Sequence, residues 1–180
     1  MDKQKYSSAE TSINKNKVPA LYKIVEKYIS KNSTILDYGA GKYNTGIEYY
    51  KNKNITVLPY DKYNRSRESN SKTFDSIKKM NGVNICLCAN VLNVIAENDF
   101  IIDILEDIYN NLNVHGTLFL NVYEGDRSGK GKLTCKGYQR NAKTQDYIAF
   151  LKMVFPLVER RGKLLIARKT KLGLFESLNF

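Results

Sequence analysis

Short apolar runs alternate with amphipathic segments along most of this chain, and this alternation constrains the fold more than any other feature. The run 83–89 is apolar almost throughout, which is typical of a strand buried on both faces. Further apolar runs predict strands at 34–38, 55–60 and 117–123. Apolar residues at helical spacing predict helices near 18–29, 44–52, 99–112 and 147–154. Strands that alternate with helices indicate an open three-layer α/β domain with a mostly parallel sheet.

The two ends of the chain differ from its middle. Residues 1–17 are polar and predict a loose N-terminal arm, which leaves one domain over 18–180. Two runs near 157–160 and 163–168 are spaced like the strands of a hairpin. We therefore expect an antiparallel element at the C-terminal edge of the sheet.

Several classes of protein are excluded by what the sequence lacks. No run reaches the roughly 18 consecutive apolar residues that a membrane-spanning helix needs. The segment Met1–Tyr6 has no apolar signal core, so we expect a cytoplasmic protein with no membrane partner. Three cysteines argue against a disulfide framework, and a single histidine makes a dedicated metal site unlikely on composition alone. We assign no metal ligands.

Positive charge is concentrated in the last third of the chain. The net charge is +11, and the stretch 125–171 holds thirteen lysines and arginines against three acids. A concentrated positive field attracts polyanions or phosphorylated substrates. A solvated lysine-rich surface explains the same composition equally well. The basic loop 127–143 is the candidate site for nucleic acid or a phosphorylated substrate.

A glycine-containing turn follows the first predicted strand. It reads Asp37-Tyr38-Gly39-Ala40-Gly41, and its glycines permit a sharp turn and a close approach of the backbone to a ligand. Asp61 ends the second predicted strand, where an acidic side chain can accept hydrogen bonds from both hydroxyls of a ribose. Together these features indicate an adenosine-type cofactor. Asn44 stands where a dinucleotide fingerprint has its third glycine, which argues against a dehydrogenase.

With two further segments, this pattern resembles the class I S-adenosylmethionine (SAM)-dependent methyltransferases. The segment Cys88–Ile95 is similar to that family's fourth-strand motif, and Asn111–Leu118 is similar to its approach to the fifth strand. The resemblance implies a Rossmann-like fold with a seven-stranded type of sheet, SAM as cofactor and methyl transfer as activity. It also implies roles for five residues. Asp37 orients the methionine end, Gly39 and Gly41 pass close to the cofactor, Asp61 holds the ribose and Asn90 lines the floor near the methyl group.

The chain also departs from the family pattern. Asn93 and Val94 stand where the fourth-strand motif usually has an acid and a histidine, so no general base carries over and the catalytic group is unassigned. The segment 62–82 predicts a loop with at most a short strand near 72–74, and Asp75 is only a candidate for the acid that contacts adenine. Asp37 and Asp61 could instead be turn-forming acids.

Four polar residues on loops after the strands are candidates for substrate binding. They are Tyr123, Glu124, Tyr138 and Asn141. Tyr123 fits the core equally well. Glu124 is the one acid among them that could act as a base, although a solvated loop acid is the simpler interpretation.

Three hypotheses follow. The first is a methyltransferase that acts on nucleic acid, a nucleotide or a small molecule. The second is a non-catalytic SAM-binding regulatory module, because no base is identifiable. The third is a basic nucleic-acid-binding protein without a cofactor.

Overall fold

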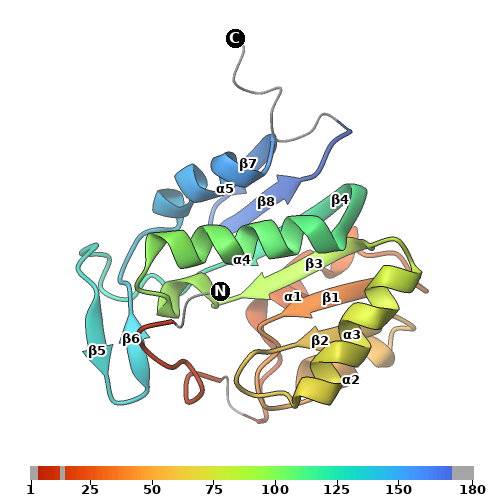
Figure 1. The fold of residues 1–180 in the computed structure, drawn as a ribbon, viewed down its shortest axis with the longest axis horizontal. Coiled ribbons are helices and arrows are strands. Elements are labelled where there is room, and N and C mark those ends of the chain that lie inside the picture. Colours follow the sequence, from red (N-terminus) through yellow and green to blue (C-terminus); the bar gives the residue numbers. More distant parts are fainter. Residues whose placement is uncertain (1–3, 13–14, 172–180) are drawn as a thin grey trace.

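Six strands form one sheet in the order β2-β1-β3-β4-β8-β7 (Figure 1). The computed structural model describes residues 4–12 and 15–171. β2, β1, β3 and β4 are parallel, and β8 runs antiparallel to both of its neighbours. The strands are β1 (Thr34–Tyr38), β2 (Thr56–Tyr60), β3 (Val83–Ala89), β4 (Leu112–Asn121), β7 (Leu157–Arg161) and β8 (Leu164–Arg168).

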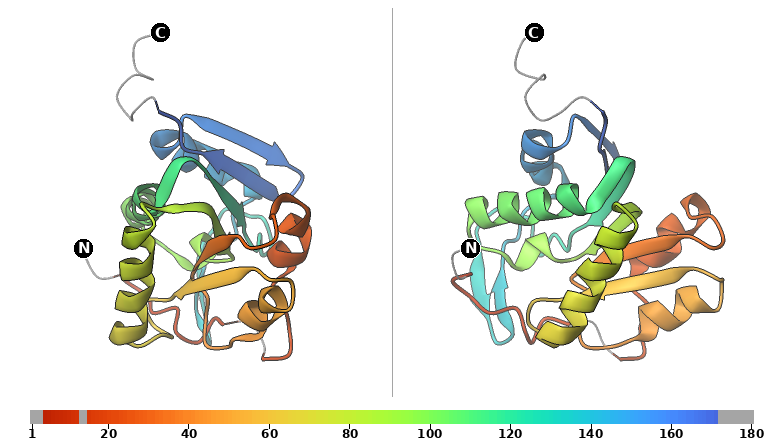
Figure 2. Two further views of the ribbon diagram at one scale, coloured as in Figure 1. Left: turned by 90° about the vertical axis from the view of Figure 1, so that its right-hand side faces the viewer. Right: turned by 45° about the vertical axis from the view of Figure 1, so that its right-hand side comes forward.

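Helices cover both faces of this sheet, which makes three layers (Figure 2). Apolar side chains of α3, α4 and α5 pack on one face, and those of α1 and α2 pack on the other. The helices are α1 (Ala20–Val25), α2 (Thr45–Lys51), α3 (Arg67–Lys79), α4 (Asn98–Asn111) and α5 (Ile148–Val154). Among the described residues, no helix has the length and apolar character needed to span a membrane.

The predicted fold class is confirmed, with one correction to the strand count. The described residues form a six-stranded main sheet, not the seven-stranded type that the resemblance implied. The segment between β2 and β3 was expected to be a loop with at most a short strand, and this expectation is wrong: it forms the thirteen-residue helix α3. Ser66 caps α3 by accepting a hydrogen bond from the Ser69 N–H (3.1 Å). The buried residues of α3 are Thr73 and Ile77, so the helical spacing of apolar residues along this segment is weak.

The basic segment after β4 is more ordered than a loop. It forms a two-stranded hairpin of β5 (Lys132–Thr134) and β6 (Gly137–Gln139). In Figure 1 this hairpin lies beside the described part of the N-terminal arm. The ring of Tyr6 stacks on Tyr138 at 5.4 Å between centroids, and the buried Gln4 side chain donates to the Val94 carbonyl (3.2 Å). The arm therefore packs across the carboxyl ends of the parallel strands.

Candidate cofactor and acceptor site

The reversal of strand order locates the site. The chain passes from β1 to β2 on one side and then crosses to β3 on the other side of β1. Open α/β sheets bind ligands in the crevice at such a reversal, beyond the carboxyl ends of the strands. The predicted cofactor residues follow β1, β2 and β3, so the fold brings all of them to this crevice.

The turn after β1 is fixed by β2 and by the loop after β3. The N–H groups of Gly39 and Ala40 both donate to the Tyr60 carbonyl (2.8 and 2.9 Å). A Cβ on Gly39 would lie 2.2 Å from Cγ2 of Val91, and the φ of Gly39 is +85°. Glycine is therefore required at position 39 by conformation and by space. Both of these N–H groups are used within the protein, so neither is left to bind a ligand. The absence of a side chain at the glycines instead lets other groups approach the backbone of the turn closely.

Asp37 is a buried carboxylate at the end of β1. It is 4% exposed and accepts a hydrogen bond from the Tyr22 hydroxyl. Burial raises the pKa of Asp37 to about 6, although the hydrogen bond from Tyr22 and the charge of Arg65 act in the opposite direction. The ionised form is thus costly here, and a cationic ligand would stabilise it.

Asp61 organises the loop after β2. Its Oδ1 accepts hydrogen bonds from the N–H groups of Tyr63 (3.0 Å) and Asn64 (2.8 Å). Its Oδ2 accepts from the Gly41 N–H (2.9 Å) and so joins the loops after β1 and β2. A carboxylate oxygen accepts about two hydrogen bonds, so Oδ2 retains capacity for a ligand hydroxyl. Asp61 is thus a turn-forming acid whose second oxygen can still bind a ligand.

Two adjoining hollows open at the crevice and share Gly39, Asp61 and Val91. The first contains about 650 Å³ of open space and is polar. Asp37 and Asn90 are among the residues that line it. The second contains about 530 Å³, and its lining includes Tyr60, Phe100, Asp103 and Ile104. Together they form one cleft with a polar end and an aromatic end. Asn90 is exposed at its rim, with φ +57°.

Three contributions to this cleft were missed from the sequence. Arg65 donates from Nε to the Gly41 carbonyl (3.0 Å) and from Nη1 to Asn44 Oδ1 (2.8 Å), which ties the loop between β2 and α3 to the glycine turn. Ser12 of the arm accepts a hydrogen bond from the Lys42 N–H (3.2 Å) and lines the polar hollow. Both contacts join segments far apart in the sequence, so no local motif signals them.

Asn121 is the third missed contribution. It pairs with Ala89 in the β3–β4 register, and its Oδ1 is buried with no hydrogen-bond partner among the described residues. Phe119, two residues earlier, packs in the core on the α1 side, and alternation along β4 puts Asn121 on the same face. An unpaired acceptor beside the polar hollow costs free energy unless a ligand satisfies it.

The four predicted substrate residues have different surroundings. Tyr123 is 63% exposed, which excludes a core role. Tyr138 is half-buried under Tyr6. Asn141 is 1% exposed and donates to the Lys130 carbonyl (3.0 Å), so it holds the loop together. None of the four lines either of the two hollows.

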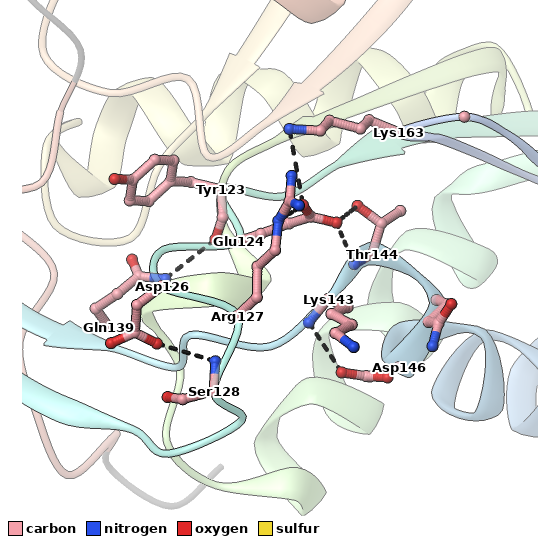
Figure 3. Close-up of polar contacts among 12 residues, drawn as sticks. Tyr123, Glu124, Asp126, Arg127, Ser128, Gln139, Lys143, Thr144, Asp146 and Lys163 are labelled. Carbon is pink, nitrogen blue, oxygen red and sulfur yellow. Dashed lines mark hydrogen bonds and ion pairs between the residues drawn. The ribbon is translucent and has the colours of Figure 1, made fainter.

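Glu124 is held by its neighbours. Its Oε1 accepts hydrogen bonds from the Thr144 N–H (2.8 Å) and hydroxyl (2.9 Å), and its Oε2 pairs with Arg127 (2.8 Å). These contacts, with Thr144 contributing most, lower the pKa of Glu124 to about 2. A carboxylate this acidic is a weak base at neutral pH, so the geometry argues against the base role considered above. Figure 3 shows this arrangement.

Metal ligands and disulfides do not enter the site. In the parts of the chain that the structure describes, no cluster of three or more histidine, cysteine, aspartate or glutamate side chains is arranged to hold a metal ion. Cys86 and Cys88 are free and buried in β3, and Cys135 is free and exposed. Burial raises the pKa of both strand thiols, which therefore pack as apolar groups.

This fold is that of the class I SAM-dependent methyltransferases. The chain is similar to a TehB-like SAM-dependent methyltransferase from Corynebacterium glutamicum, with a TM-score of 0.54 and 16% identity over 87% of this chain and 90% of that one. It is also similar to the sugar N-methyltransferase KedS8 from Streptoalloteichus, with a TM-score of 0.52 and 9% identity over 84% and 85% of the two chains. No protein-family model matches the sequence, and a search of curated proteins gave no match. At these identities the likeness establishes the fold.

Proposed function

We propose that this protein is a SAM-dependent methyltransferase whose cofactor binds across the two adjoining hollows. The observation that carries the proposal is the buried carboxylate of Asp37 at the polar end of the cleft. Burial raises its pKa to about 6, so the ionised carboxylate is destabilised and a cation beside it would stabilise it. The ammonium of the cofactor's methionine end is such a cation. The likeness of the fold to two SAM-dependent methyltransferases supports the same cofactor.

The other residues of the cleft fit the remaining parts of SAM. Asp61 Oδ2 accepts a hydrogen bond from the ribose. The adenine packs in the aromatic hollow against Tyr60 and Phe100, and Asp103 accepts from its amino group. Gly39 lines both hollows, and because it has no side chain its backbone can lie close to the cofactor.

The residues around the polar hollow orient the reactants and exclude water. SAM supplies a methyl group that is already activated on a sulfonium, so the protein contributes chiefly position and a dry site. Asn90 lines this end together with Ser8 and Ser12 of the arm, and Asn121 pairs in the sheet with the neighbouring Ala89. We propose that the described part of the arm, 4–12 and 15–17, is a cover of the domain and acts by limiting the access of water.

A second candidate, a non-catalytic SAM-binding module, is favoured by the contacts of Asn93. This buried side chain stands where the family usually has an acid. It donates to Gln139 Oε1 (3.2 Å) and accepts weakly from the Tyr123 N–H (3.4 Å), so it connects the loop after β3 to the hairpin. Its role is structural, and no proton acceptor replaces it.

Two measurements test the proposal in sequence. Calorimetry with SAM, S-adenosylhomocysteine and NAD should show binding of the first two, and mass spectrometry should detect either of them in the purified protein. Binding to NAD alone would refute the cofactor assignment. Formation of S-adenosylhomocysteine in the presence of candidate acceptors separates the enzyme from the binding module. The candidates should include nucleotides, RNA, DNA and amino sugars, because one structural neighbour is a sugar N-methyltransferase.

A further inference from the structure

A basic hollow lies between the loop after β4, the segment before α5 and the turn that joins β7 to β8. It contains about 740 Å³ of open space, and four cations from three separate segments line it. These are Arg127, Lys143, Arg160 and Lys163. Glu124 is the carboxylate in its lining. Two of these four cations, Arg160 and Lys163, were counted in the sequence only as part of a general excess, because they lie outside the basic loop 127–143.

Glu124 neutralises only part of this charge. Its Oε2 pairs with Arg127 at 2.8 Å and with Lys163 at 3.7 Å, and the side chain is 12% exposed. Figure 3 shows both cations directed at its carboxylate. Arg160 donates to neutral acceptors, the Gly162 carbonyl (3.0 Å) and Gln145 Oε1 (3.3 Å). Four cations against one carboxylate leave an excess of three positive charges around one concavity.

The carboxylates nearest in the sequence do not cancel this excess. Asp126 accepts from the Ser128 N–H (2.9 Å) and approaches Lys132 at 3.9 Å, and Asp146 accepts from the Lys143 N–H (2.8 Å). Glu159, next to Arg160 in the sequence, pairs instead with Arg161 (2.6 Å) and Arg168 (3.8 Å), and none of the three acids lines the hollow. A concave site with this excess attracts an anion of more than one negative charge.

The hollow lies within reach of the place where methyl transfer would occur. The Asn121 carbonyl accepts a hydrogen bond from the Asn90 N–H (3.0 Å), and Glu124 follows Asn121 by three residues. Three residues span at most about 11 Å. An acceptor of nucleotide size can therefore place one end beside Asn90 and the other among the cations, passing the exposed ring of Tyr123.

We propose that the basic hollow binds a phosphate group of the methyl acceptor, so that the acceptor is a phosphorylated molecule. This inference rests on the proposed methyltransferase function. Arginine binds phosphate oxygens in a bidentate manner, and lysine adds point charges around them. Glu124, held ionised by Thr144, keeps Arg127 and Lys163 at the rim before the phosphate binds.

Binding of inorganic pyrophosphate tests the hollow directly. Amide NMR titration should give saturable shifts at Arg127, Thr144 and Gly162. The variant Lys143→Gln/Lys163→Gln should bind pyrophosphate at least about tenfold more weakly. Lys51→Gln/Lys152→Gln removes the same net charge from exposed positions outside the hollow and should leave the affinity unchanged. Equal weakening in both variants, or shifts spread over the whole surface, would overturn the proposal.

Three further arms make the test decisive. Lys143→Arg/Lys163→Arg keeps the charge and should retain affinity within about threefold, which distinguishes lost binding from lost folding. Uridine 5′-monophosphate and a single-stranded RNA decamer distinguish a single phosphate from a phosphodiester chain. A chain contacting several phosphates should give a log–log salt slope of roughly −0.7 per phosphate.

Calorimetry with S-adenosylhomocysteine on the same proteins separates the two proposals. If the wild-type protein binds that molecule and none of the phosphate probes, the phosphate inference fails while the proposed function stands. If it binds the phosphate probes without binding the cofactor, the proposed function fails and this hollow is no longer an acceptor site.

Discussion

The two halves of the carboxyl edge of the sheet are built in different ways. The β2-β1-β3 half depends on backbone turns and buried acids: Gly39 packs against Val91, and Asp61 bonds to the Gly41 N–H. The β4-β8-β7 half depends on exposed cations around Glu124. Backbone geometry tolerates few substitutions, whereas exposed charged side chains vary at little cost to stability. The first half therefore suits a fixed cofactor, and the second suits an acceptor that differs between proteins of one fold.

The largest effect is expected from Gly39→Ala. Its Cβ would lie 2.2 Å from Val91 Cγ2 at a φ of +85°, so clash and strain add. We expect a loss of about 3 kcal/mol in the free energy of unfolding, measured by denaturant titration. Gly162→Ala is the matched control, because its φ is +62° with nothing within 4 Å of the Cβ, and it should lose about 1 kcal/mol.

A double variant makes this comparison sharper. Gly39→Ala/Val91→Ala removes the opposing methyl group and should recover part of the loss, seen as a coupling energy in the mutant cycle. Equal losses at positions 39 and 162 would mean that conformation alone requires the glycine. In that case the two halves of the edge would not differ in packing at this turn.

Asp37→Asn should separate a ligand-binding acid from a structural one. Affinity for S-adenosylhomocysteine should fall about 10- to 100-fold, the usual value of a hydrogen bond to a charged group. The free energy of unfolding at neutral pH should stay equal or rise, because the folded protein no longer buries a costly anion. Asp75→Asn on α3 is the control, since Asp75 is exposed and lies outside the cleft. A loss of stability without loss of affinity would assign Asp37 to the fold alone.

The pH dependence of cofactor binding tests the same carboxylate. The ammonium prefers the ionised form of Asp37, whose pKa before binding is about 6. Affinity should therefore rise about tenfold per pH unit below 6 and level off above about 7. Tyr22→Phe removes a hydrogen bond that lowers this pKa, so the midpoint should move to higher pH. A flat profile in calorimetry between pH 5 and 8 would contradict the role.

The same contrast explains how much the sequence could predict. Strands such as β3 were predicted at their observed bounds because seven mostly apolar residues in one run have few alternatives. Helix α3 was missed because its three serines and Asn70 favour turns individually, and its Ser66 cap was outweighed by that composition. Asp37 and Asp61 could be selected from the sequence because each lies at the end of a strand, so their position follows from local pattern alone.

Contacts between distant segments could not be predicted in this way. The Tyr22 hydroxyl reaches Asp37 only once α1 packs on the sheet, and Arg65 reaches the Gly41 carbonyl only once the loop after β2 folds against the glycine turn. Glu124 was a plausible base in the sequence, and its acidity became evident only from Thr144, twenty residues away. A role that depends on a residue and its immediate neighbours in the chain can be predicted from the sequence. A role that depends on a partner elsewhere in the chain cannot.

The smallest effects are expected within the basic loop 127–143, where cations that look alike in the sequence have different roles. Arg140 donates to the carbonyls of Ile95 (3.1 Å) and Ala96 (3.2 Å), and its guanidinium lies 5.4 Å from the ring centroid of Phe150. Arg140→Gln should lower the free energy of unfolding by about 1–2 kcal/mol, because two carbonyls lose a charged donor. Lys132 approaches Asp126 at 3.9 Å with both side chains largely exposed. Lys132→Gln should therefore change the free energy of unfolding by less than about 0.5 kcal/mol. Denaturant unfolding of both variants checks this difference. Equal small changes would show that Arg140 contributes no more to stability than Lys132. Its guanidinium would then be free to bind an anion, and the basic surface around Glu124 would include the base of the hairpin.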